Sequence, residues 1–234
     1  MRHARALATL LLAILLGAAA AAQDAQPGTI RVASRLFLVG EGLSASDTQE
    51  DFLPLTRVPW AWQMIQEDPM LDGAVVHIER TPSPPAYLFS RERLAREFPD
   101  TVRVPDAFRI SGYEVATTDG EVARMFLFRP DVPAPDFLVT CTTNVPLLPT
   151  DQPSFCALRA SYPPDPAITL LARLYNPPPF AELHGRFEPI ADRLRVIALC
   201  LDVTDSPPAD PEAALAALLA ENPRLEGCED RLSS

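Results

Sequence analysis

The sequence predicts an α+β fold in which an antiparallel β-meander sheet has helices packed on one face. Two patterns predict it. Short strand-like runs follow one another between positions 108 and 175 and are bounded by prolines or turn residues, which is typical of consecutive antiparallel strands. Beyond Pro189, apolar residues recur at helical spacing as far as Leu201, which predicts a helix with one apolar side. With 47% hydrophobic residues, the 234-residue chain is able to bury a sizeable core.

The first 22 residues have the three parts of a secretory signal peptide. Arg2 and Arg5 precede an apolar run over 6–16, and the small residues 20–22 offer a cleavage site. The apolar run is shorter than the roughly 20 residues that span a bilayer, so we expect no stable membrane insertion after cleavage. Removing these 22 of the 234 residues leaves 212, and losing the two arginines takes the formal charge from −11 to −13.

The N-terminal elements are predicted from parity and from prolines. Four apolar residues lie at even-numbered positions, so in an extended chain their side chains point to the same side: Ile30, Val32, Leu36 and Leu38. This alternation predicts a single half-buried strand over 30–38. A polar, acidic loop follows at 41–51. The remaining expectations are a short helix over 60–66, a strand over 74–79 and a short helix over 90–98 with Ser90 as its N-cap.

The centre of the chain predicts the meander itself. Alternating apolar residues over 108–115 are shifted in phase at Gly112, which indicates a bulge. Asp119 and Gly120 then separate this run from the next, at 122–128, and predict a tight hairpin. The proline-bounded runs that follow predict three more strands, over 137–145, 155–162 and 168–175.

The C-terminal part is predicted to be helical. The apolar stripe over 190–201 belongs to a helix that we expect to pack on the sheet. Residues 203–211 are typical of a linker, and Asp210 followed by Pro211 predicts the start of a second helix. The expected organisation is a signal peptide at 1–22, one α+β domain at 23–202, and a linker with a tail helix at 203–234.

Export changes the interpretation of the four cysteines, because an oxidising compartment favours disulfides. Cys141 and Cys156 lie on expected neighbouring strands, whereas Cys200 ends the predicted helix and Cys228 lies in the tail. Four cysteines allow three connectivities, of which we favour Cys141 with Cys156 and Cys200 with Cys228. No CxxC pair is present, so the spacing does not indicate a zinc site.

Charge and motifs exclude several classes of function. The acidic excess argues against nucleic-acid binding, which requires a basic surface. The chain contains no lysine, so a P-loop is impossible, and it has no GxSxG, GxGxxG or HExxH motif. We therefore expect no enzyme activity, no cofactor and no metal ion.

The two tryptophans, Trp60 and Trp62, lie near Phe52 in a proline-rich segment, and these three aromatic residues are the candidate recognition residues. Core packing is the alternative role for them. The combined features favour a periplasmic or secreted, non-catalytic binding or accessory protein with a protein partner in the cell envelope, such as an inhibitor- or immunity-type protein. The alternatives are a structural envelope component and a hydrolase that uses carboxylates or His184.

Overall fold

The computed structural model describes residues 27–41, 43, 51–81, 93, 96, 101–103, 114–118, 123–128, 136–143 and 152–228. The expected signal peptide, the bulge at Gly112 and most of the expected loop at 41–51 lie outside these residues. Of the expected helix at 90–98, the structure describes Arg93 and Arg96, both of them helical.

Strands form the centre of the described chain, and four helices follow the last strand. The strands are β1 (Thr29–Val32), β2 (Arg35–Leu38), β3 (Phe52–Pro54), β4 (Ala74–Arg80), β5 (Thr101–Arg103), β6 (Glu114–Thr118), β7 (Ala123–Phe128), β8 (Phe137–Thr143), β9 (Phe155–Ser161) and β10 (Ile168–Tyr175). The helices are η1 (Leu55–Arg57), α2 (Pro59–Glu67), α5 (Phe180–Leu183), η3 (His184–Arg186), α6 (Phe187–Leu201) and α7 (Pro211–Glu221). Together they confirm a mixed α+β protein.

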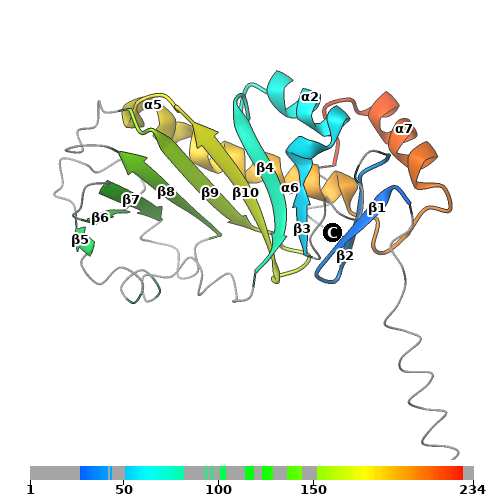
Figure 1. Cartoon of the computed structure of the whole chain (residues 1–234), viewed down its shortest axis with the longest axis horizontal. Coiled ribbons are helices and arrows are strands. Elements are labelled where there is room, and N and C mark those ends of the chain that lie inside the picture. The colour runs from blue at the N-terminus through cyan, green and yellow to red at the C-terminus, as the bar shows by residue number, and fades with distance from the viewer. Residues whose placement is uncertain are drawn as a thin grey trace, which may run out of the picture.

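An eight-stranded antiparallel sheet runs through the molecule in the order β3-β4-β10-β9-β8-β7-β6-β5 (Figure 1). Strands β5 to β10 follow one another in chain order, as a meander does, and β6 pairs with β7. The turn expected at Asp119 and Gly120 lies outside the described residues. Strands β3 and β4, which are connected through η1 and α2, extend the sheet beyond the last meander strand, because β4 pairs with β10. This long-range pairing and the short strand β5 were not predicted from the sequence.

The prediction of a single strand over 30–38 is wrong, because the chain folds back there into a separate two-stranded hairpin. Ala33 turns the chain with a positive φ of 50°, which the sequence does not signal with a glycine or an asparagine. Carboxylates from distant segments hold the turn instead. Asp51 accepts a hydrogen bond from the Ala33 amide, and Asp165 accepts from the Ser34 amide.

The hydrophobic core lies between the sheet and α6, which crosses behind β9, β10 and β4 in Figure 1. Alternate residues of the strands point into this core, and they include Ala74, Val76 and Ile78 of β4. Most residues of α6 are buried, including every residue from Leu194 to Leu201. Leu215 of α7 and Leu225 beyond it also belong to the core, so the C-terminal segment packs on the same cluster.

Both disulfides of the structure join the pairs suggested by the sequence. Cys141 and Cys156 lie directly opposite each other on β8 and β9, with their Cα atoms 4.1 Å apart. Cys200, near the end of α6, is bonded to Cys228. The paired cysteines are 15 and 28 positions apart in the sequence, so the loop-closure entropy corresponds to about 3 and 3.5 kcal/mol.

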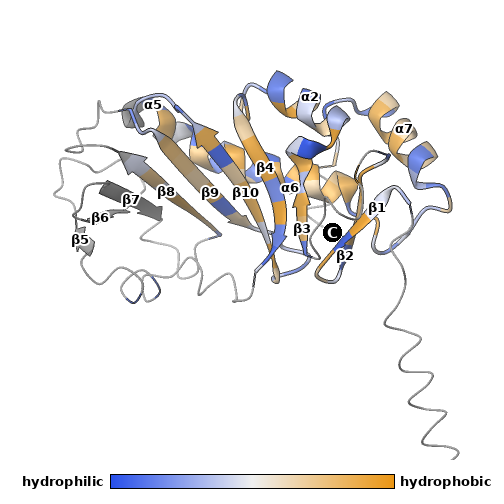
Figure 2. Cartoon of the chain, in the orientation of Figure 1, coloured by the Kyte–Doolittle hydropathy of each residue, from blue (hydrophilic) through white to orange (hydrophobic). Residues whose placement is uncertain are grey.

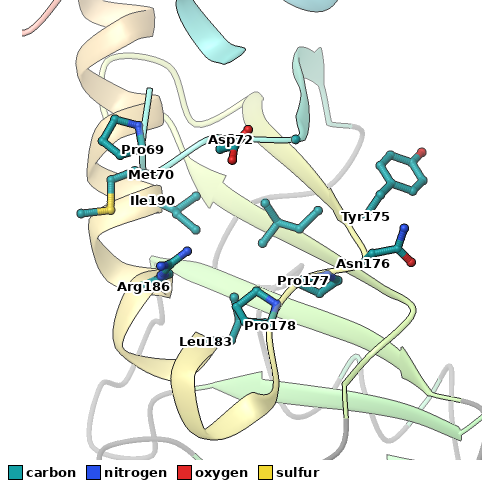
Figure 3. Close-up of a pocket in the computed structure, with 12 residues that line it drawn as sticks. Pro69, Met70, Asp72, Tyr175, Asn176, Pro177, Pro178, Leu183, Arg186 and Ile190 are labelled. Carbon is teal, nitrogen blue, oxygen red and sulfur yellow. The ribbon is translucent and has the colours of Figure 1, made fainter. Parts of the chain in front are cut away.

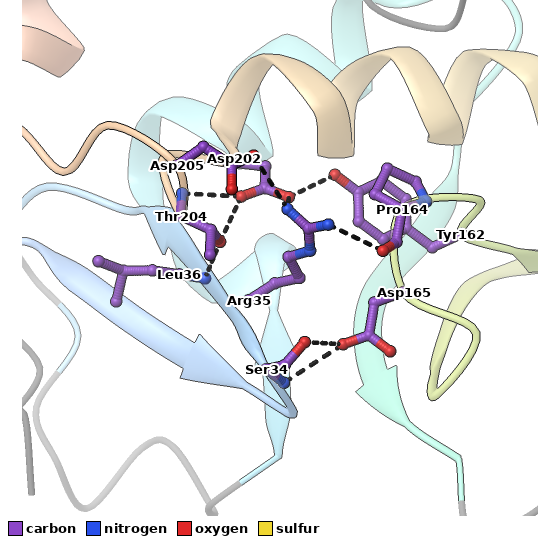
Figure 4. A network of polar contacts seen from close by, with 9 residues as sticks. All are labelled: Ser34, Arg35, Leu36, Tyr162, Pro164, Asp165, Asp202, Thr204 and Asp205. Atoms are coloured by element: carbon purple, nitrogen blue, oxygen red, sulfur yellow. Dashed lines mark hydrogen bonds and ion pairs between the residues drawn. The ribbon is translucent and has the colours of Figure 1, made fainter. Parts of the chain in front are cut away.

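A polar network attaches the β1–β2 hairpin to the rest of the fold (Figure 4). Arg35 donates to the Pro164 carbonyl at 2.8 Å and forms an ion pair with Asp202, just after α6, at 3.6 Å. The Tyr162 hydroxyl donates to the same Asp202 carboxylate at 2.7 Å, and the Leu36 amide donates to Thr204 Oγ1 at 2.8 Å. These contacts fix the hairpin both on the loop between β9 and β10 and on the segment that follows α6.

Candidate functional site

An open cavity of about 430 Å³ lies where three segments that are distant in the sequence meet (Figure 3). One wall is the loop between α2 and β4, a second is the end of β10 with the prolines after it, and the third is the start of α6 with the short helices before it. We call it the β10–α5 cavity. Its lining residues are Pro69, Met70, Asp72, Gly73, Leu174, Tyr175, Asn176, Pro177, Pro178, Leu183, Arg186 and Ile190.

The α2–β4 loop has its conformation set by Asp68, a buried carboxylate at the end of α2. Asp68 Oδ1 accepts a hydrogen bond from the Met70 amide at 2.9 Å, and its other oxygen accepts one from Arg193 of α6. Gly73 then enters β4 with a φ of +70°, a conformation that a glycine adopts without strain. The Met70 side chain is thereby presented at the mouth of the cavity, 40% exposed.

The opposite wall is stiffened by prolines. Asn176 follows β10 in the left-handed conformation, with a φ of 48°, and its amide donates to the Ser154 carbonyl at 3.2 Å. Pro177 and Pro178 come next and have no backbone freedom in φ. Tyr175, at the end of β10, is 53% exposed. Its ring contacts that of Phe155, the residue opposite it on the neighbouring strand β9, and the ring centroids are 5.3 Å apart.

The chemistry of the lining suits binding. The floor is apolar, from Ile190, Leu174 and Leu183, whereas Arg186 and Asp72 contribute one charge of each sign. Among the described lining residues, the titratable side chains are these two and Tyr175. The cavity therefore offers an apolar recess with polar groups near it, which is the usual composition of a recognition pocket.

The three aromatic residues predicted for recognition have different environments. Phe52 is half-buried and stacks on the ring of His77, 4.8 Å away, and Trp60 is half-buried and donates from Nε1 to the Val39 carbonyl at 2.9 Å. Trp62 is 44% exposed. Because residues two apart on a helix point in different directions, Trp60 and Trp62 do not present one surface. Recognition stays a prediction for Trp62, and the cavity was missed because three distant segments build it.

The two histidines among the described residues lie on different elements of the fold. His77 and Glu79 point to the same side of β4, as their alternation implies, and His184 lies in η3. No group of three or more histidine, cysteine, aspartate or glutamate side chains in the described part of the chain is placed to hold a metal ion.

No protein-family model, curated protein or solved structure matches this chain. The two disulfides indicate a protein of an oxidising compartment outside the cytoplasm. Within the described ranges, every helix is too short or too polar to cross a membrane. The geometry of the cavity therefore carries the functional argument alone.

Proposed function

We propose that this chain is a non-catalytic binding protein, exported to the periplasm or secreted, that holds a protein partner of the cell envelope in the β10–α5 cavity. The observation that carries the proposal is the cavity itself, a recess of about 430 Å³ with an apolar floor and two exposed, largely apolar side chains, Met70 and Tyr175. Exposed apolar and aromatic side chains beside a recess are typical anchors of protein interfaces.

The construction of the walls supports binding to a partner without rearrangement. Prolines restrict the backbone on both sides of the recess, at positions 69, 177 and 178. Asp68 holds the α2–β4 loop by accepting a hydrogen bond from the Met70 amide. A preformed recess loses little conformational entropy on binding, which favours affinity. The net charge of −11 favours a partner with a basic surface around the inserted apolar group.

Site-specific photocrosslinking tests this proposal in the cells that produce the protein. A photoreactive phenylalanine replaces Tyr175 beside the cavity, Trp62 on α2, or the exposed Glu221 at the end of α7 as a control. We expect one dominant adduct of defined mass from position 175 and none from 221. Non-reducing electrophoresis checks that each variant has formed its disulfides.

Three results would contradict the proposal. Absence of an adduct at position 175 in a correctly oxidised variant excludes the cavity as the contact surface. An adduct at position 62 alone moves the contact to α2 and favours the tryptophan over the cavity. Equal labelling at all three positions indicates collisions without a specific partner.

A further inference from the structure

Charged and buried polar side chains gather on the sheet face that points away from α6. The core-facing residues of β4, β10 and β9 alternate with a second set, so His77, Glu79, Thr169, Arg173 and Arg159 share the opposite face. The register brings them close, since Leu171 lies between His77 and Arg159, and Thr169 lies opposite Glu79. Figure 2 shows hydrophilic positions on β9 and β10 among hydrophobic ones.

Two members of this cluster are buried without a hydrogen-bond partner among the described residues. His77 is 7% exposed, and neither Nδ1 nor Nε2 has a partner. Thr169 is 1% exposed, and its hydroxyl is likewise unpaired. An unsatisfied buried polar group destabilises a protein, so such groups are rare unless water or an ion satisfies them. Three unpaired polar atoms on neighbouring strands therefore indicate a site for a polar ligand.

The electrostatics of the cluster indicate that this ligand is an anion. Arg173 and Arg57 act on His77, and together with burial, the largest cause, they lower its pKa to about 4. Burial also lowers the pKa of Arg159, and Arg93 and Arg173 lower it further.

Glu79 is the carboxylate that opposes these arginines among the described residues. Its own pKa is raised by burial despite the attraction of Arg159 and Arg173. Among the described residues, Glu79 thus faces two guanidinium groups, those of Arg159 and Arg173. These three side chains together carry one positive charge, opposite in sign to the net charge of −11 of the whole chain.

We propose that His77, Thr169, Arg159 and Arg173 form a binding site for an oxyanion of the phosphate or sulfate type. The threonine hydroxyl and the imidazole N–H donate hydrogen bonds to its oxygens, and the two guanidinium groups supply charge and further donors, which is the chemistry that oxyanions require. The site is on the sheet, separate from the β10–α5 cavity, and it does not depend on the function proposed for that cavity.

The test is a titration of the mature protein, labelled at its histidines, with inorganic phosphate at low ionic strength, followed by NMR of the His77 ring. We expect a saturable shift of the ring signals and a rise in the His77 pKa, because a bound anion favours the imidazolium form. Sodium sulfate and sodium acetate are parallel arms that define the class of oxyanion. Sodium chloride at equal ionic strength is the control for screening.

Variants assign the effect to the cluster. Arg173→Gln should weaken phosphate binding by about tenfold or more, since a charge-assisted hydrogen bond is lost. Arg186→Gln, the same change in the cavity, should leave it unaltered. The proposal is overturned if the wild-type protein shows no saturable shift with phosphate or sulfate, if chloride produces the same shift, or if both variants bind equally. The wild-type titration decides the question even where a variant fails to fold.

Discussion

The ion pair of Arg193 and Asp68 leads to the sharpest stability prediction, because one guanidinium joins three segments of the fold. Arg193 of α6 donates from Nε to Asp68, from Nη1 to the Leu225 carbonyl at 2.9 Å, and from Nη2 to the Arg224 carbonyl. Both side chains of the pair are almost fully buried. The same carboxylate also holds the Met70 amide, so the pair positions the loop of the β10–α5 cavity.

Replacing Arg193 with Met leaves the Asp68 carboxylate buried without a cation and removes the donors of two carbonyls. Breaking a buried pair in this way costs about 3–5 kcal/mol in the free energy of unfolding. For a domain of 150–250 residues each kcal/mol lowers Tm by about 2–4 °C, so a decrease of about 6–20 °C follows. Arg186→Met, the same substitution at an exposed position, should change stability by less than about 0.5 kcal/mol.

The assay is equilibrium urea unfolding with both disulfides intact, followed by tryptophan fluorescence and near-UV circular dichroism. The double variant Arg193→Met, Asp68→Asn should recover much of the loss, because the amide oxygen still accepts from Met70 while the buried charge is gone. The reasoning is refuted if Arg193→Met is as stable as Arg186→Met. It is also refuted if the double variant is no more stable than Arg193→Met alone.

Two further predictions concern backbone strain and pH. Gly40 and Gly73 have nearly equal φ values, +69° and +70°, but a Cβ at Gly40 would lie 2.7 Å from a methyl group of the buried Leu215, whereas one at Gly73 meets nothing within 4 Å. Gly40→Ala should therefore destabilise by about 1–3 kcal/mol more than Gly73→Ala in the same urea assay, and equal losses would contradict the packing argument. His77 takes up its proton at about pH 4 in the folded protein and at about 6.5 when unfolded, so its contribution to stability falls as pH decreases from about 6.5 to 4. NMR titration in phosphate-free buffer measures this, and a midpoint near 6.5 would refute it.

Local signals predicted those elements whose cause lies in a few neighbouring residues. The stripe over 190–201 became α6. Asp210 caps α7 by accepting from the Ala213 amide at 3.0 Å, as expected of an aspartate before a proline. In each case the side-chain period or the turn chemistry specifies the backbone without help from distant segments.

The β1–β2 hairpin shows why some elements escaped prediction. The apolar residues of this segment alternate as they would in one continuous strand. The turn residues, Ala33 and Ser34, are not of the types that usually mark a tight turn. The turn is held by carboxylates 18 and 131 residues away in the chain, on Asp51 and Asp165. A contact of that kind leaves no local pattern.

Periodicity and covalent chemistry act over short distances, so the sequence was enough to predict the strand-rich centre and the apolar helix packed on it, and to favour one of the three cysteine pairings. Only the tertiary structure decided that β4 pairs with β10, since that pairing closes a loop of nearly ninety residues in chain order. The same pairing places His77 beside Arg173, and the arrangement of loops around β10 builds the cavity. Both candidate sites arise from long-range packing, which is specified by the whole core and by no single segment.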